Sequence, residues 1–392
     1  MKFLCLLGFL LACLASCQPK PPESLSGIIK INPDEFINPP KDATEWIESM
    51  KFIALETPTG QFVPDDANTK IRGNFILLGN DKKLLIFDLS GKFLNQIDAR
   101  GAGPREYRYI ADYDLLPDKD QIVILDNKMM VFYKTDGTFI EKVPVPFRCL
   151  NIAPLGKDYF GFAPVRVPQA AGDSSGNYQV FIMDRKGKIT DRKFGFPFAV
   201  VNTNQPAFVR SPADQGSLVA LPFDDDIYQL GPGPTIKLKY QFDFGAFNSD
   251  TAYLHNQTML NDFQFLSRNQ IRVFPLEGFA ETNGTLMLRC SSEKQQKLAF
   301  RLISLKSGNH KTVVMEVPPK IGTFHGWNIY SHRTAFGDYF VYTLTAMDAM
   351  ENIGKLSVEQ KKVLSEFPGF KSLQNLKDDD NPVLVLYKVK DF

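Results

Sequence analysis

Two clusters of side chains have residue types that could bind or transform a ligand. The first lies beside a Gly-Pro turn and combines basic with aromatic groups: Arg100, Arg105, Tyr107, Arg108 and Tyr109. Guanidinium groups hold carboxylates, sulfates and sugars through forked hydrogen bonds, and aromatic rings stack on sugars. The alternative is a structural turn fixed by Gly101, Gly103 and Pro104, in which Glu106 pairs locally with an arginine.

The second cluster combines imidazole, indole and phenol side chains that lie close together in the sequence: His325, Trp327, Tyr330 and His332. Such a set could stack a sugar ring or supply an acid/base pair. The alternative is packing in the core or beneath a loop, which uses the same residue types. We predict ligand binding by this cluster together with Arg100, Arg105, Tyr107 and Arg108.

Catalytic and metal-binding motifs are scarce. The chain has no HExxH, CxxC, P-loop or dinucleotide-binding pattern, so we expect no metal, no cofactor and no catalytic residue. The aspartate runs at 224–226 and 378–380 lack the spacing of a calcium loop and are expected to be solvated turns. The alternative is a lactonase-like hydrolase or lyase with a divalent metal in a channel. Its available ligands would be Asp112, Asp126, Asn204, Asp224 and Asn328.

The first residues predict export. Lys2 precedes an apolar run over residues 3–15 that is too short for a permanent membrane span, as in a signal peptide. The run ends in Leu14-Ala15-Ser16-Cys17, which resembles the lipobox of bacterial lipoproteins. The alternative is ordinary secretory cleavage near a chance cysteine. We expect a signal peptide over 1–16, a lipidated tether over 17–26 that begins at Cys17, and one domain over 27–392.

The residue after the lipidation site bears on location. Gln18 stands where an aspartate would resemble an inner-membrane retention signal, so we expect an outer-membrane lipoprotein, on either the periplasmic or the surface face. The mature chain carries equal numbers of acidic and basic side chains, because the signal peptide contains one lysine and no acid. This balance argues against nucleic-acid binding. We expect a monomer whose membrane contact is the lipid, with Cys149 and Cys290 as buried thiols rather than a long-range disulfide.

The elements that must position these residues follow a repeat. Six times an apolar run ends in a tight polar turn and a second run follows, at 84–93, 130–139, 180–189, 227–236, 300–311 and 383–389. A further strand-like run precedes each copy. Four strands in each of six repeats predict an all-β fold, a six-bladed β-propeller of antiparallel blades. The alternative is a β-sandwich.

The last copy leaves no room for an outermost strand before the C-terminus. We expect residues 27–31 to supply it and to close the ring, with residues 52–56 as the first strand of blade one. Deletion of residues 24–32 should then lower the melting temperature sharply.

The repeat also sorts the loops into two faces of the ring. The turns between the first and second and between the third and fourth strands are short and define the short-turn face. The opposite, long-loop face receives the longer segments at 163–178, 196–212, 245–272, 318–334 and 346–382. A capping box at Ser357-Val358-Glu359-Gln360 predicts a helix over 358–367, and a looser pattern predicts one over 251–266. We expect these helices to be lids, or else partner-binding helices, and any site to lie on this face.

Three phrases carry a family resemblance: residues 52–57 (FIALET), 87–93 (FDLSGKF) and 101–107 (GAGPREY). They resemble phrases of NHL-like and TolB-like six-bladed propellers, in particular lipoproteins common in Bacteroidetes and mostly of unknown function. Arg105 departs from the glycine usual in that family. The resemblance implies a fold and a compartment, and we expect a non-catalytic lipoprotein that binds a glycan, peptide or protein through the long-loop face. Asp250-Thr251-Ala252 resembles an O-glycosylation site of these bacteria, with Thr251 as the acceptor.

Overall fold

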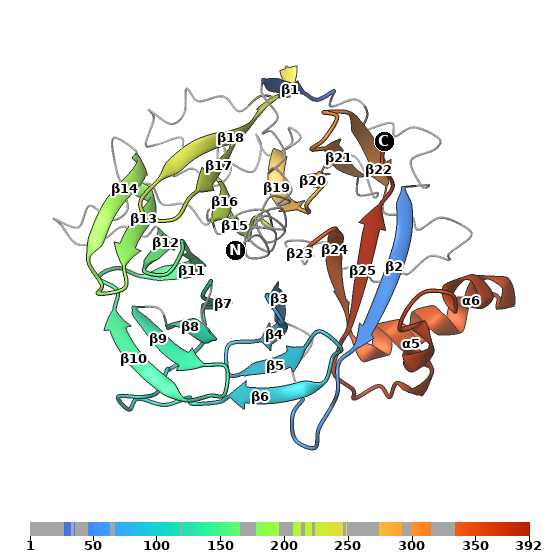
Figure 1. Ribbon diagram of the computed structural model, residues 1–392, viewed down its shortest axis with the longest axis horizontal. Coiled ribbons are helices and arrows are strands. Elements are labelled where there is room, and N and C mark those ends of the chain that lie inside the picture. Colours follow the sequence, from blue (N-terminus) through green and yellow to red (C-terminus); the bar gives the residue numbers. More distant parts are fainter. Residues whose placement is uncertain are drawn as a thin grey trace, which may run out of the picture.

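The computed structural model describes residues 27–32, 35, 46–62, 67–117, 120–126, 128–164, 178–195, 207–212, 216–221, 224–245, 248, 274–291, 299–314 and 334–392. These residues form six antiparallel meanders arranged around an axis, as the view down the ring shows (Figure 1). The first strand of each meander lies at the centre and the fourth at the rim (Figure 1). The predicted six-bladed β-propeller is confirmed.

The first three blades are continuous in the chain. Blade one contains β3 (Asn68–Arg72), β4 (Phe75–Gly79), β5 (Leu84–Asp88) and β6 (Phe93–Ile97). Blade two contains β7 (Asp112–Leu115), β8 (Gln121–Asp126), β9 (Met129–Lys134) and β10 (Phe139–Pro144). Blade three contains β11 (Cys149–Pro154), β12 (Tyr159–Pro164), β13 (Tyr178–Asp184) and β14 (Ile189–Gly195).

Of the last three blades, blades four and six each contain one strand from the N-terminal segment. Blade four contains β15 (Ala207–Arg210), β16 (Ser217–Ala220), β17 (Ile227–Leu230) and β18 (Ile236–Asp243), with β1 (Ile28–Lys30) as a fifth strand. Blade five contains β19 (Phe274–Glu281), β20 (Thr285–Ser291), β21 (Ala299–Ser304) and β22 (His310–Val314). Blade six contains β23 (Thr334–Phe336), β24 (Tyr339–Leu344), β25 (Val383–Val389) and β2 (Ile47–Ala54).

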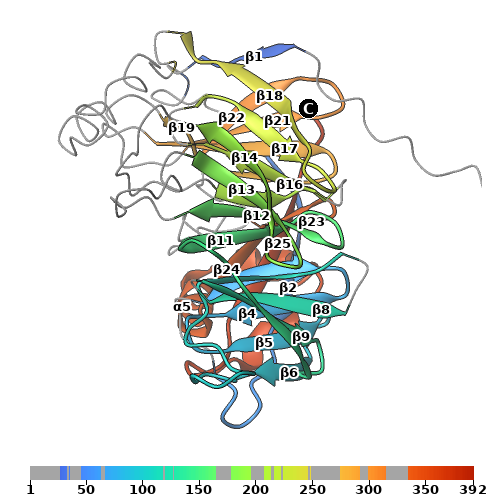
Figure 2. The same cartoon turned by 90° about the vertical axis from the view of Figure 1, so that its left-hand side faces the viewer.

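The middle strands of a blade are apolar without alternation because both of their faces are covered by neighbouring blades. In blade one, Leu77, Leu84 and Ile86 are fully buried and pack against strands of blade two. Burial of such a side chain contributes about 1.5–3 kcal/mol. The ring seen edge-on shows the blades side by side, with their strands running between the two faces (Figure 2). This is why the second and third strands were the clearest signal in the sequence.

An N-terminal strand closes the ring, as predicted, but the predicted residues were wrong. β2 pairs antiparallel with β25, from Ile47 opposite Val389 to Ala54 opposite Val383. Residues 52–54 therefore belong to blade six, and blade one begins with β3. Residues 28–30 form β1, which pairs parallel with β18 on a blade that already has four strands. The segment 24–32 is therefore not the closing strand.

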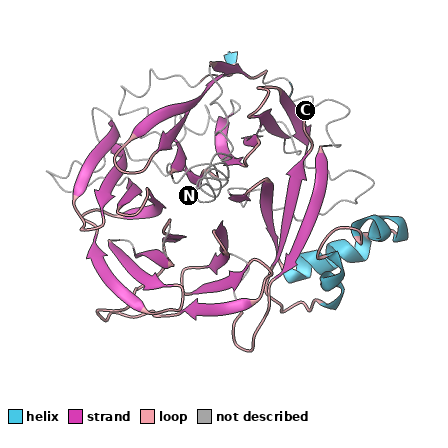
Figure 3. Ribbon diagram, in the orientation of Figure 1, coloured by secondary structure: helices cyan, strands magenta, loops and turns pink. Residues whose placement is uncertain are grey.

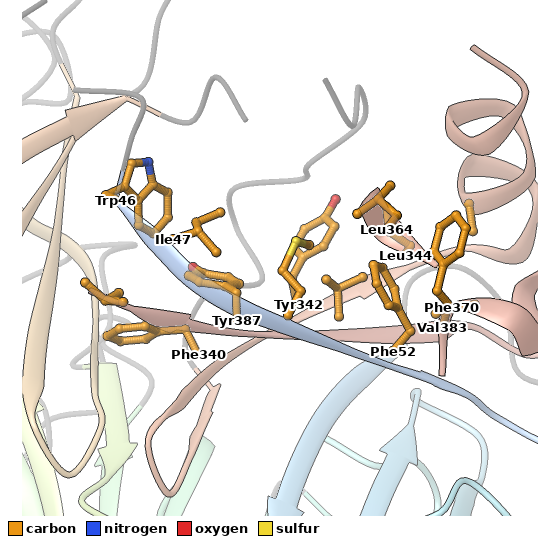
Figure 4. Packing of buried hydrophobic residues seen from close by; sticks show 14 of the residues in the cluster. Trp46, Ile47, Phe52, Phe340, Tyr342, Leu344, Leu364, Phe370, Val383 and Tyr387 are labelled. Atoms are coloured by element: carbon orange, nitrogen blue, oxygen red, sulfur yellow. The ribbon is translucent and has the colours of Figure 1, made fainter. Parts of the chain in front are cut away.

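Side chains of β2 build much of the core of blade six. Trp46 meets Tyr387 edge-on, with ring centroids 5.4 Å apart, and Phe52 meets Phe370 at 5.5 Å (Figure 4). Phe370 belongs to η6 (Phe370–Asn375), a 3₁₀ helix in the insertion between β24 and β25. At Gly369, just before η6, a Cβ atom would lie 1.9 Å from the Phe52 carbonyl oxygen, so only glycine fits there.

The same insertion holds α5 (Ala346–Lys355) and α6 (Val358–Leu364). The predicted capping box is confirmed, since the Ser357 amide donates to Gln360 Oε1 at 2.8 Å and the Gln360 amide donates to Ser357 Oγ at 3.2 Å. Both helices lie at the outer rim beside β2, not over the axis, so the predicted lid is wrong for them (Figure 3). The helix predicted over 251–266 lies outside the described residues. Within the described part of the chain, no helix has the length and apolar character needed to cross a membrane.

Candidate functional site: an axial cavity on the short-turn face

A cavity of about 700 Å³ opens on the axis where the inner strands meet their short turns. Five blades contribute to it, and its lining is made by residues 71–75, 115–117, 120, 210–212, 283 and 335–337. These residues lie in the turns that join first to second strands or at the strand ends beside them, so the cavity lies on the short-turn face. The sequence predicted a site on the opposite face, and this cavity was not predicted.

Two tight hairpins fix the backbone at its rim. β3 and β4 are joined by Gly73-Asn74 between the paired residues Arg72 and Phe75, and β23 and β24 are joined by Gly337-Asp338. The first residue of each turn has a positive φ, 55° at Gly73 and 58° at Gly337. This is the position at which a type II′ hairpin requires glycine. The rim is therefore held by short, hydrogen-bonded connections.

A buried carboxylate organises the basic wall of the cavity. Asp114 of β7 is 4% exposed and accepts from Arg72 Nε at 2.7 Å and from Arg72 Nη2 at 3.2 Å. Arg210 Nη1 lies 3.8 Å from the same carboxylate. Burial tends to raise the pKa of Asp114, but the charges of Arg72, Lys70 and Arg210 lower it more in sum, to about 2. The carboxylate thus stays ionised and anchors two arginines that line the cavity.

The ion pairing continues along β3 and β7, the inner strands of blades one and two. Lys70 donates to Asp112 Oδ1 at 2.7 Å and to the Tyr113 carbonyl at 2.6 Å. Alternate residues of a strand share a face, so Lys70 and Arg72 of β3 meet Asp112 and Asp114 of β7. These ion pairs join the inner strands of blades one and two.

A second buried network lies next to the cavity at the joint of blades four and five. Glu281 is 1% exposed and accepts from Ser211 Oγ at 2.6 Å, Lys239 Nζ at 3.0 Å and Tyr240 OH at 2.7 Å. Ser211 also lines the cavity. A buried carboxylate with this many donors is strongly held, so this wall is rigid as well.

The predicted arginine and tyrosine cluster is a structural turn that carries exposed arginines. Tyr107 is fully buried, and its hydroxyl lies 2.8 Å from the Lys82 carbonyl oxygen and 3.0 Å from that of Ile97. Burial raises the pKa of Tyr107. Its ring packs edge-on against Tyr133, whose hydroxyl donates to the Arg105 carbonyl at 2.7 Å. Tyr107 therefore has no surface to offer a ligand.

The neighbouring turn is rigid as well. The Glu106 carboxylate accepts from the Gly103 amide at 2.7 Å, and a Cβ at Gly101 would lie 1.9 Å from Glu106 Oε2. The backbone amide of Arg108 donates to Asp126 Oδ2 at 3.0 Å. The side chains of Arg100, Arg105 and Arg108 are exposed. Binding by these three arginines stays a prediction.

The other predicted residues are placed as follows. His325, Trp327, Tyr330, His332, Thr251 and Cys17 lie outside the described residues, as do Asn204 and Asn328. Cys149 is buried, and burial raises the pKa of its thiol. The side chain of Cys290 is not among those described.

The acidic residues proposed as metal ligands do not converge. Asp112 is held by Lys70 and by the Ile152 amide at 2.9 Å, whereas Asp224 accepts from Tyr228 OH at 2.8 Å in blade four. Across the described part of the chain, no group of three His, Cys, Asp or Glu side chains is arranged to hold a metal. The run 224–226 is partly buried rather than a fully solvated turn. Burial raises the pKa of Asp224 and, with the Asp224 charge, that of Asp226 to about 6.

Comparison with known proteins identifies the family. Residues 28–388 match the family described as a domain of unknown function, DUF4934. The chain belongs to the DUF4934 family. No curated protein matches it.

One solved structure shares the fold of this DUF4934 chain, and two others are less similar. A candidate exported protein of Bacteroides fragilis NCTC 9343 is 19% identical, with a TM-score of 0.68 over 93% of this chain and 100% of its own. A DUF4221 member from Bacteroides vulgatus ATCC 8482 is 10% identical, with a TM-score of 0.47 over 90% and 99% of the two chains. Virginiamycin B lyase of Staphylococcus aureus is 9% identical, with a TM-score of 0.40 over 87% and 99%. The expected kinship with Bacteroides propellers of unknown function is confirmed.

This DUF4934 chain also contains a short motif that is typical of some hydrolases. Gly172, Ser174 and Gly176 form a GxSxG pattern, in a segment between β12 and β13 that lies outside the described residues. In hydrolases that pattern works at a strand-to-helix turn of an α/β sheet, whereas β12 and β13 are antiparallel neighbours in one blade. The pattern alone therefore predicts no nucleophile.

Proposed function

We propose that this protein is an exported, lipid-anchored binding protein that holds a ligand on the axis of its propeller without transforming it. The axial cavity is the observation that carries the proposal, because its volume lies in the range of small-molecule sites and its walls are fixed in advance. Export and anchoring at Cys17 rest on the signal-like N-terminus and lipobox. The Bacteroides fragilis relative, a candidate exported protein, supports the same compartment, with the outer membrane as the proposed location.

The long-loop face remains part of the proposal as a surface for a glycan, peptide or protein. Arg100, Arg105 and Arg108 project from the rigid turn between β6 and β7 on that face. The likeness to NHL-like and TolB-like propellers supports a binding role for such loops only by analogy. The described acidic residues give the lyase alternative no support, since Asp112, Asp126 and Asp224 have separate partners.

The cavity is tested by filling its mouth. Asn74 is exposed at the rim, whereas Asn309 is an exposed residue of another short turn on the same face, away from the lining. Oligosaccharides and peptides are screened by calorimetry against the purified protein. For any ligand found, Asn74→Trp should abolish binding and Asn309→Trp should leave it unchanged. Binding that survives Asn74→Trp and is lost in Arg105→Ala would move the site to the long-loop face.

Anchoring is tested separately. Cells that express the protein are fed a radiolabelled fatty acid, and the label on the protein is measured. We expect label on the wild type and none on Cys17→Ala. A soluble, unlabelled wild-type protein would contradict the lipid anchor and leave the binding proposal intact.

A further inference from the structure

We infer that the axial cavity takes a small organic carboxylate whose body is apolar or ring-shaped. This inference rests on the proposed function and adds the chemical class of the ligand. It follows from the arginines of the lining, the hydrogen-bonding capacity of Arg72 and the apolar residues of the same lining. Each of these is a separate observation.

Two guanidinium groups line the cavity. Among the described residues, the side chains of Lys70, Arg72 and Arg210 lie within 4.0 Å of the Asp112 or Asp114 carboxylate. Both arginines line the cavity, whereas neither aspartate does. A ligand therefore meets guanidinium groups whose countercharge lies behind them. The third charged lining residue, Asp120, is exposed at the rim, where solvent screens it.

Arg72 has hydrogen-bonding capacity left for a ligand. Its Nε and Nη2 donate to Asp114, and its Nη1 donates to the Ile71 carbonyl at 2.9 Å. A guanidinium group has five N–H donors, so one hydrogen on each terminal nitrogen is not used by these three bonds. Two neighbouring N–H groups on a planar fork match the two oxygens of a carboxylate. The pairing with Asp114 also holds the fork in place before a ligand arrives.

The remaining lining is largely apolar. Phe75 and Phe336 flank the two glycine hairpins, Leu115 is the last residue of β7, and Leu116 and Pro117 follow it. An inorganic anion would leave these side chains without contacts, whereas a ring can stack on them while its carboxylate reaches the arginines. Sugar acids and aromatic acids both have this chemistry.

The test compares acids with neutral partners of the same shape. Galacturonate and galactose form one pair, and benzoate and benzamide form the other, each titrated by calorimetry into the full-length protein. We expect at least one acid to bind, with at least tenfold lower affinity for its neutral partner and weaker binding at higher salt. Preference for galacturonate would identify a sugar acid, and preference for benzoate an aromatic acid.

A charge at the mouth provides the matched variant. Asn74→Asp adds a negative charge beside the cavity and should weaken the bound acid about fivefold, whereas Asn309→Asp adds the same charge away from the axis and should not. Arg72→Lys keeps the charge beside Asp114 but removes the forked pair of N–H donors. It should weaken binding of the acid more than Asn74→Asp does. Because that change touches a buried pair, its melting curve is recorded as well.

The outcomes separate this inference from the proposed function. If galactose or benzamide binds as tightly as its acid and Asn74→Trp removes both, the cavity is a binding site and the carboxylate inference is overturned. If the acids bind but Asn74→Trp has no effect, the cavity proposal fails as well. If none of the four probes binds at millimolar concentration, the carboxylate inference fails, and the screen described above still decides the function.

Discussion

β1 and β2 are both N-terminal strands at the outer edge of a blade, yet their structural roles differ. β2 is eight residues long and pairs antiparallel with β25, which otherwise would be the exposed edge of a three-stranded blade. β1 is three residues long and pairs parallel with β18, on a blade that is already complete. Position at the rim is thus common to both strands, but only one of them is needed for closure.

Truncation should give the largest contrast between them. A chain that begins at residue 33 loses β1 and should still fold, whereas one that begins at residue 55 also loses β2 and the core contacts of Trp46 and Phe52. We expect the longer deletion to abolish cooperative unfolding, because blade six then has an open edge and an exposed core. Thermal melts by circular dichroism measure this. Equal melting temperatures for the two chains would contradict the comparison.

A matched pair of substitutions should reproduce the contrast on a smaller scale. Ile53 of β2 is 5% exposed and packs between blades six and one, whereas Ile29 of β1 is only partly buried. We expect Ile53→Ala to lower the free energy of unfolding by about 2–5 kcal/mol and Ile29→Ala by about 1 kcal/mol. Urea titrations at equilibrium provide both values. A larger cost at Ile29 would reverse the assignment of roles.

Between the two strands, Glu35 fastens the N-terminal segment to blade five. It pairs with the buried Arg301 and lies 3.0 Å from Thr312 Oγ1, and Arg301 also contacts His310. Burial tends to raise the pKa of Glu35, but the Arg301 hydrogen bond and charge and the Thr312 bond lower it more in sum. The carboxylate therefore stabilises the fold above the pKa of the unfolded chain, and this contribution is lost as pH falls through the lower folded pKa.

We expect Glu35→Gln to cost about 1–2 kcal/mol near neutral pH, because Arg301 is 1% exposed and loses its countercharge. The difference in unfolding free energy from the wild type should shrink as the pH falls through the lowered folded pKa of Glu35, below which the carboxyl group is protonated in both states. Urea titrations across this range measure it. A difference that does not change with pH would mean that the charge of Glu35 is not what matters.

The smallest expected effect belongs to His310. Burial and then the charge of Arg301 lower its pKa, so the folded state favours the neutral ring. Stability from this group is lost as pH falls below about 6.5, the usual value of the unfolded chain. His310→Gln should flatten that part of the pH profile by less than about 1 kcal/mol, with little change at pH above about 7. A profile that keeps its slope there would exclude His310 as the cause.

The blade count could be predicted from the sequence because the second and third strands are continuous apolar runs. The first strand of blade one could not, since β3 reads Asn-Thr-Lys-Ile-Arg and looks like a polar loop. Lys70 and Arg72 are neutralised by Asp112 and Asp114, which lie 42 residues further along the chain. Without that pairing, residues 52–56 looked like the better first strand, and the closing strand was therefore misassigned.

The axial cavity was missed for the same reason. Arg72 and Arg210 lie far apart in the sequence, and only the folding of the ring brings both close to Asp114. The clusters that the sequence did indicate are formed by residues close together in the chain. In one of them the aromatic residue Tyr107 is buried in the core. Short-range sequence patterns thus indicated turns and caps, such as the capping box at Ser357, better than they indicated the site.

The pairing of β2 with β25 also has a consequence for how the chain folds. β2 begins at Ile47, whereas its partner begins at Val383, so β2 leaves the ribosome long before β25 does. Contacts between such distant segments are slow to form because a large loop must close first. Blades one to five can assemble from sequential hairpins, but blade six must wait until β25 has been synthesised. We expect the unpaired β2 strand to be the segment most exposed to aggregation during synthesis.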